Sequence, residues 1–239
     1  MRHKAMRRAV VVAATSAAVG LAAVPATGST TIASWQMNEG SGATVMHDAS
    51  GNGIDGSVGS HIITGFTYAG ATGYDWPYVK PNQPPADPER LATASDSRLN
   101  PGTSVYSVTV RFRTTHDFGN IIQKGQSGTS GGYWKWQLPK GQLTCLFRGV
   151  VNGTKVSKAV NSGTLLLNDG RWHTVTCTRT TTGVTMTIDG GTTRKATGWT
   201  GSISNSKPLA IGGKLNCDQS TVTCDYFTGD IDYVTITKG

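Results

Sequence analysis

Apolar and polar side chains alternate with a period of two residues along several short segments of the chain. The alternation is clearest in 107–113, and it recurs in 229–238. Because successive side chains of a β-strand point to opposite faces, this pattern predicts half-buried antiparallel strands. In 229–238 it places Ile231 and Tyr233 on the face opposite Val234. The segments 172–180 and 184–189 predict an antiparallel pair joined by a short turn.

Turn-forming dipeptides such as Asn152-Gly153 and Asp169-Gly170 separate these segments. Short strands at this spacing predict an all-β fold, a two-sheet antiparallel sandwich or jelly roll, with one domain over residues 30–239. The stretch 76–90 differs because its five prolines exclude a central strand. It is expected to be a rigid surface excursion or a lid over a binding face.

Composition supports an all-β fold. The 239 residues include 14 acidic ones, and only Glu39 and Glu89 among them are glutamates, whereas glycine occurs 31 times. Glutamate favours helices and glycine marks turns, so helices are expected to be rare. A charged fraction of 15% also argues against a disordered chain or an array of charged helices.

The N-terminus predicts a secretory signal peptide over residues 1–26. Four basic residues within 2–8 precede an uncharged, alanine-rich run over 9–26 that ends in small residues. A membrane anchor is the alternative, but the run is barely the roughly 18 residues needed and is only weakly apolar. Cleavage would lower the net charge from +8 to +4. The exported chain is thus expected to be extracellular, with neither a nucleic acid nor a membrane as partner.

The four cysteines predict two structural disulfides, although four cysteines allow three pairings. Cys145 and Cys177 each fall on the apolar face of a predicted strand, so they are expected to meet on neighbouring strands. Cys217 and Cys224 enclose six residues, a loop short enough to close on itself. A zinc site is the alternative, but the chain has no C-x-x-C motif.

Four segments carry a resemblance to a known family. They are 33–39 (ASWQMNE), 48–53 (DASGNG), 169–175 (DGRWHTV) and 227–234 (FTGDIDYV). In this order they resemble laminin G-like domains of the concanavalin A-like lectin/glucanase superfamily, in particular secreted actinobacterial single-domain members. The resemblance runs from about residue 32 to residue 238. It implies a jelly roll of two curved sheets, with members that bind glycans or proteins, often with calcium, and others that are glycosidases.

The glucanases of that superfamily carry carboxylates in the pattern Glu-x-Asp-x-Glu, and this chain lacks it, since Glu39 and Glu89 stand fifty residues apart. Asp230 and Asp232 share a strand face, but the family has a structural Asp there. The segment 128–132 matches G-x-S-x-G without the strand and helix that a nucleophile elbow needs. The chain is therefore predicted not to be an enzyme, with a lyase that uses Tyr or His as its base left open.

Aromatic and polar side chains indicate where a ligand would bind, because sugars stack their C–H faces on aromatic rings. In 132–138 the alternation assigns Trp134, Trp136 and Leu138 to the core, and the opposite face to a polar ligand surface. Two arginines of 107–113, and Lys124, would line the same surface if their strands neighbour it. Ordinary solvated charge is the alternative. The candidate ligand-binding residues are Tyr133, Lys135, Gln137, Arg111 and Arg113.

A calcium site is predicted at the segment 48–54. Side-chain oxygens of Asp48, Ser50 and Asn52 and the backbone carbonyl of Ile54 follow the spacing of the first half of a calcium loop. No Glu occupies the twelfth position, so a second carboxylate is needed. The family resemblance implies that Asp232 supplies it. Asp55 is a reserve ligand, and a metal-free Asx-type turn is the alternative.

These observations together predict a secreted, extracellular, non-catalytic module that binds a glycan or cell-surface polymer and is supported structurally by calcium. A polysaccharide-cleaving hydrolase or lyase of the same fold is one alternative. An adhesion domain with a protein partner is another.

Overall fold

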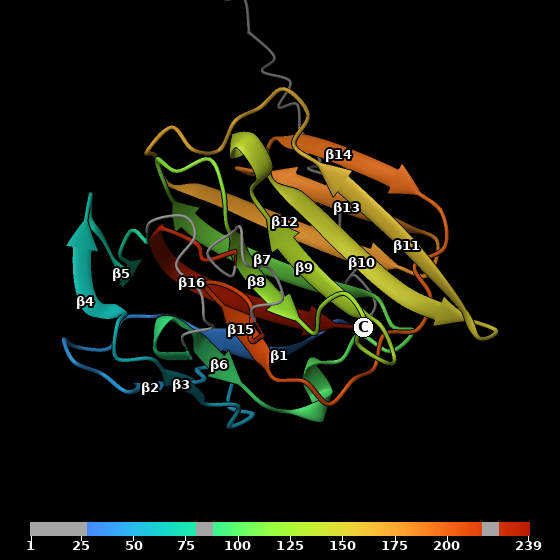
Figure 1. Cartoon of the computed structure of the whole chain (residues 1–239), viewed down its shortest axis with the longest axis horizontal. Helices are drawn as coiled ribbons and strands as arrows, with labels where there is room; N and C mark the ends of the chain where they lie inside the picture. Colours follow the sequence, from blue (N-terminus) through green and yellow to red (C-terminus); the bar gives the residue numbers. More distant parts are fainter. Residues whose placement is uncertain (1–27, 80–87, 217–224) are drawn as a thin grey trace, which may run out of the picture.

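The computed structural model describes residues 28–79, 88–216 and 225–239, and it is built almost entirely of β-strands. Figure 1 shows two antiparallel sheets as two layers. The first sheet, A, contains in spatial order β14 (Thr192–Thr197), β13 (Gly183–Ile188), β12 (His173–Thr180), β7 (Tyr106–Arg113), β16 (Gly229–Lys238), β5 (Ala71–Trp76) and β4 (Ile63–Tyr68), and β1 (Thr30–Trp35) also pairs with β16.

The second sheet, B, contains in spatial order β11 (Thr154–Asn161), β10 (Thr144–Val151), β9 (Tyr133–Gln137), β8 (Asn120–Lys124), β15 (Leu209–Ile211), β6 (Ala92–Ala94), β3 (Gly56–Val58) and β2 (Val45–Met46). The helical elements of the described residues are three 3₁₀ turns, at Pro88–Arg90, Ser97–Leu99 and Pro139–Gly141. The predicted all-β jelly-roll sandwich is confirmed.

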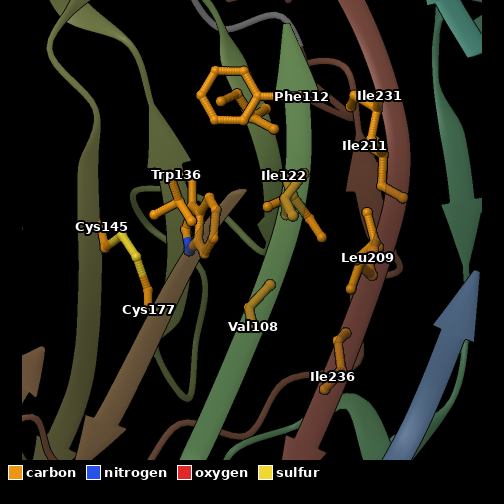
Figure 2. Packing of buried hydrophobic residues seen from close by; sticks show 14 of the residues in the cluster. Val108, Phe112, Ile122, Trp136, Cys145, Cys177, Leu209, Ile211, Ile231 and Ile236 are labelled. Carbon is orange, nitrogen blue, oxygen red and sulfur yellow. A yellow bond between two sulfur atoms is a disulfide. The ribbon is translucent and has the colours of Figure 1, made fainter. Parts of the chain in front are cut away.

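The period-two pattern correctly identifies the core face of most strands. Val108, Val110 and Phe112 of β7 are fully buried, as are Trp134 and Trp136 of β9 on the facing sheet. Figure 2 shows several of these side chains between the two layers. The predicted hairpin is confirmed as the β12–β13 pair.

The pattern is wrong for the second half of β16. A bulge in the pairing of β16 with β7 falls between Ile231 and Tyr233. The extra residue shifts the alternation by one, so Val234 and Ile236 join Ile231 in the core. Tyr233 is left half-buried. A local sequence pattern could not reveal this bulge, because it is defined by the partner strand.

The predicted disulfide between Cys145 and Cys177 is confirmed, with a Cα–Cα distance of 6.4 Å. The expected arrangement on neighbouring strands is wrong: Cys145 lies on β10 of sheet B and Cys177 on β12 of sheet A. Figure 2 shows the bond crossing the core beside Trp136. The disulfide therefore links the two sheets to each other.

Three predictions fall wholly or partly outside the described residues. These are the signal peptide over 1–26, the second disulfide between Cys217 and Cys224, and most of the proline-rich stretch. Of that stretch, β5 ends at the buried Trp76 and a 3₁₀ turn begins at Pro88. Within the described ranges, no helix has the length and apolar character to cross a membrane.

Candidate functional site

Three charged side chains lie side by side on the outer face of sheet A, away from the core. Asp230 of β16 is paired in register with Asp75 of β5 on one side and with Arg113 of β7 on the other. Their chain neighbours Tyr74, Ile231 and Phe112 point into the core, so these three point outward. We call Asp75, Arg113 and Asp230, with the aromatic rings around them, the outer-face site.

Arg113 and Asp230 form a two-point ion pair. The Nε of Arg113 donates to Oδ2 of Asp230 at 2.6 Å, and Nη2 contacts the same carboxylate. The Asp230 side chain is only 3% exposed. Burial raises the pKa of Asp230, against the opposing effect of the Arg113 charge.

Asp75 is the second carboxyl of the outer-face site, and it hydrogen-bonds to Asp230. Burial, followed by the negative charge of Asp230, raises the pKa of Asp75 from 3.8 to about 6. One guanidinium thus faces two carboxyl groups, which hold a proton between them more tightly than exposed carboxylates would.

Aromatic rings cover both arginines of β7. The guanidinium carbon of Arg113 lies 3.5 Å from the ring centroid of Tyr68, and that of Arg111 lies 5.0 Å from the ring of Trp172. Nε1 of Trp172 donates to the backbone oxygen of Tyr68 at 3.3 Å, and Arg111 forms an ion pair with Asp232. Each arginine is therefore held between a carboxylate and a ring.

A cavity of about 370 Å³ opens beside the outer-face site, where β5, β7 and β16 meet. Asp75, Asp230 and Arg113 form its polar wall, and Phe66 contributes an apolar wall. Tyr78 and His116 stack at its rim with ring centroids 4.9 Å apart and planes 15° apart, and Tyr78 is 56% exposed. The cavity thus offers hydrogen-bonding carboxyls next to an exposed ring face.

The candidate ligand-binding residues do not form one surface. Arg111 and Arg113 lie on sheet A, whereas Tyr133, Lys135 and Gln137 lie on β9 of sheet B and face outward on the opposite side. The strands β7 and β9 are not neighbours, so the condition for a shared surface is not met. Tyr133 is 6% exposed, which leaves its ring no free face for stacking on a ligand.

Lys124, the remaining cation considered for that surface, does not face it. It pairs with Trp134 and is buried, and its Nζ donates to the backbone oxygens of Asn205 and Lys207. Burial lowers its pKa.

Sequence reasoning missed Asp75, Tyr68, Tyr78 and His116. Tyr68, Asp75 and Tyr78 reach Arg113 and Asp230 through the pairing of β5 with β16, whereas His116 lies in the loop directly after β7. More than 150 residues separate Asp75 from Asp230, and no local pattern links them.

The segment predicted to bind calcium forms an Asx-type turn. Asp48 accepts hydrogen bonds on Oδ1 from the backbone N–H groups of Ser34 and Ser50, and on Oδ2 from the Ser50 hydroxyl and the Ile54 N–H, at 2.8 to 3.0 Å. Hydrogen bonds from the Ile54, Ser34 and Ser50 N–H groups lower the pKa of Asp48 against the opposing effect of burial. Asn52 donates to the backbone oxygens of Thr31 and Ile32.

The two carboxylates proposed for the calcium site, Asp48 and Asp232, each have other partners in the structure. Asp232 is paired with Arg111, and Trp35 of β1 bridges to Asp48 on one side and to Val234 of β16 on the other. A calcium ion would have to displace N–H donors from Asp48 and the guanidinium from Asp232. Nowhere in the described ranges do three or more His, Cys, Asp or Glu side chains cluster as a metal site.

Among solved structures, the chain is similar to domain 4 of AbnA, an extracellular GH43 arabinanase from Geobacillus stearothermophilus, solved with arabinotriose. The identity is 15% and the TM-score 0.54, over 88% of this chain and 93% of that one. It is also similar to the botulinum neurotoxin serotype C1 binding domain, with 13% identity and a TM-score of 0.55 over 87% of this chain and 47% of the other. At these identities the likeness concerns the fold alone.

Laminin structures are also similar. Domains LG4-5 of the mouse laminin alpha1 chain share 18% identity with a TM-score of 0.44, over 58% of this chain. The chain spans 37% of that structure and 33% of the LG1-3 region of the laminin alpha2 chain. None of the curated proteins matches the chain. The family model of the laminin G domain matches residues 112–239, more than half of the sequence, so the chain belongs to the laminin G domain family.

Proposed function

We propose that this laminin G domain is a secreted, non-catalytic module that binds a glycan or cell-surface polymer at the outer-face site. The observation that carries the proposal is the cavity of about 370 Å³ in which Asp75, Asp230 and Arg113 adjoin the exposed ring of Tyr78. Carboxylate oxygens accept hydrogen bonds from sugar hydroxyls, and an aromatic ring stacks on the apolar face of a pyranose or furanose.

The rigidity of the polar wall supports binding. Arg113 is fixed by Asp230 on the neighbouring strand and by the Tyr68 ring, so its remaining N–H groups keep one orientation. A site that is already ordered loses little conformational entropy when a ligand binds. The arabinotriose complex of the AbnA domain adds a precedent for sugar binding on this fold.

The spacing of the two carboxyls argues against glycoside hydrolysis at the outer-face site. Asp75 and Asp230 are hydrogen-bonded to each other. Glycosidases hold their two carboxyls roughly 5 to 9.5 Å apart, so that a sugar or a water molecule fits between them. The contact between these two carboxyls supports a binding role for the pair.

The rim aromatic provides the first test. We expect Tyr78→Ala to weaken retention of the bound polysaccharide about tenfold, because it removes an exposed stacking surface worth roughly 1.4 kcal/mol. The measurement is affinity electrophoresis of the mature chain across a panel of polysaccharides. The matched control is Trp199→Ala, which removes another exposed aromatic that does not line this cavity.

Equal retention of the two variants would overturn the placement of the ligand at the outer-face site. New reducing or unsaturated ends in the incubated polysaccharides would instead establish an enzyme. If no polysaccharide is retained, the adhesion alternative gains support, with a protein as the partner.

Calcium support stays a prediction, to be tested by thermal unfolding. With a dissociation constant of roughly 0.1 mM, typical of extracellular modules, 10 mM calcium should stabilise the domain by about 2.7 kcal/mol. The melting midpoint should then rise by roughly 5 to 11 °C relative to chelator. Asp48→Asn should remove this rise, whereas Asp117→Asn, an exposed residue in the loop after β7, should retain it. Identical midpoints in chelator and calcium would contradict the prediction.

A further inference from the structure

A second cavity, of about 250 Å³, lies on the opposite side of the molecule from the outer-face site. The glycine-rich loop 125–132 and the strands β9, β10 and β11 of sheet B surround it. Its polar lining is formed by the hydroxyls of Ser127 and Thr129 and by the cationic side chains of Arg148 and Lys155. No acidic side chain lines this cavity.

Arg148 differs from the arginines of sheet A. Its side chain is half-buried, and across the described ranges it makes no hydrogen bond or ion pair, in contrast to Arg111 and Arg113. Its cross-strand partners on β9 and β11 are Tyr133 and Ser157, neither of which carries a charge. Within the described ranges, the Arg148 guanidinium has no anionic partner, and a bound oxyanion would supply one.

The sequence explains why no carboxylate of these strands reaches Arg148. Residues 118–168, which build β8 to β11, contain no Asp or Glu at all. The same stretch contains six basic residues, namely Lys124, Lys135, Lys140, Arg148, Lys155 and Lys158. These basic residues form no continuous run in the sequence. They come together because β8, β9, β10 and β11 are neighbours in sheet B.

The loop is held firmly against Arg148. Gly132 has a φ of 88°, and a Cβ at this position would lie 2.3 Å from the backbone oxygen of Arg148. A glycine is therefore required for the loop to pack on β10. This contact keeps the hydroxyls of Ser127 and Thr129 at the same cavity as the guanidinium.

We propose that this cavity binds a tetrahedral oxyanion, a phosphate or sulfate ester group. The guanidinium fork of Arg148 matches the geometry of such a group, and Lys155 adds a second positive charge to the cavity lining. The two hydroxyls donate the further hydrogen bonds that an ester oxygen accepts. The site goes beyond the proposed function, since it is separate from the outer-face site and selects a different chemical group.

The test measures binding of inorganic phosphate and inorganic sulfate by calorimetry, and then of dextran sulfate and a polyglycerol phosphate, with unmodified dextran as the neutral reference. We expect Arg148→Met to weaken binding of these anions at least tenfold. Methionine retains the apolar stem that packs on the sheet and removes the charge. The matched control is Arg171→Met, which loses the same charge from an 84% exposed side chain in the turn before β12 of sheet A, and we expect less than a twofold change.

Equal losses in Arg148→Met and Arg171→Met would overturn the proposal, because binding would then follow net charge alone. If Arg148→Met does not unfold cooperatively, Lys155→Met carries the same test from an exposed position. Tyr78→Ala should leave anion binding unchanged, so failure of the outer-face site and failure of this one are distinguishable. Comparing dextran sulfate with the polyglycerol phosphate shows whether the cavity prefers sulfate or phosphate esters. If the protein binds neither polymer and neither free anion, the proposal is wrong.

Discussion

Replacing both Cys145 and Cys177 with alanine is expected to lower the free energy of unfolding by roughly 3.7 kcal/mol. The disulfide closes a loop with a sequence separation of 32 residues, and the loss of its constraint on the unfolded chain accounts for this value. Because a domain of this size shifts by roughly 2 to 4 °C per kcal/mol, the melting midpoint should fall by about 7 to 15 °C. Differential scanning calorimetry measures both quantities.

The position of the bond explains why this effect should be large. The disulfide joins β10 and β12 across the core, so it holds the two sheets together as well as closing a loop. The matched control is Cys217→Ser with Cys224→Ser, because a closure of that length contributes at most roughly 2.5 kcal/mol. A Cys145→Ala, Cys177→Ala variant that melts at the wild-type midpoint would contradict the prediction.

The strands of this domain are largely predictable from the sequence, because the period-two pattern reports which side chains face the core. In β7 the pattern needs no knowledge of the partner strands, since Val108, Val110 and Phe112 are apolar and their neighbours polar. The disulfide was predictable by the same reasoning. It required only that Cys145 and Cys177 both point inward.

The outer-face site was not predictable, because it depends on which strands pair. The sequence pattern indicates that Arg111 and Arg113 face outward but not which sheet β9 joins, so it does not separate Tyr133 from them. The pattern places Asp230 and Asp232 on one strand face, but it does not indicate that Asp75, more than 150 residues earlier in the chain, pairs with Asp230. Long-range pairing decides the composition of this site.

Arg113→Met is expected to lower the free energy of unfolding by about 3 kcal/mol at pH 7.5. It removes the partner of an almost fully buried carboxylate, a change that typically costs roughly 3 to 5 kcal/mol. We expect a loss at the lower end of this range, because Arg113 lines the open cavity and is therefore partly solvated. Urea unfolding at several pH values measures the effect. The matched control is Arg111→Met on the same strand, whose partner Asp232 is more exposed and whose loss should cost about 1 kcal/mol.

The loss in Arg113→Met should depend on pH in a definite direction. In the native protein the pKa of Asp75 is raised to about 6 from its ordinary value of 3.8, so the folded state binds this proton more tightly than the unfolded state does. A carboxyl with a raised pKa is most favourable for folding at low pH, and stability falls as pH rises through the interval from about 4 to 6. Without Arg113 the Asp75–Asp230 pair has no cation, so this fall should become steeper. The variant should therefore approach wild-type stability near pH 4.5, and adding Asp75→Asn should recover much of the loss at pH 7.5. A deficit that is the same at pH 4.5 and pH 7.5 would show that Arg113 acts through packing on Tyr68 and not through the two carboxyls.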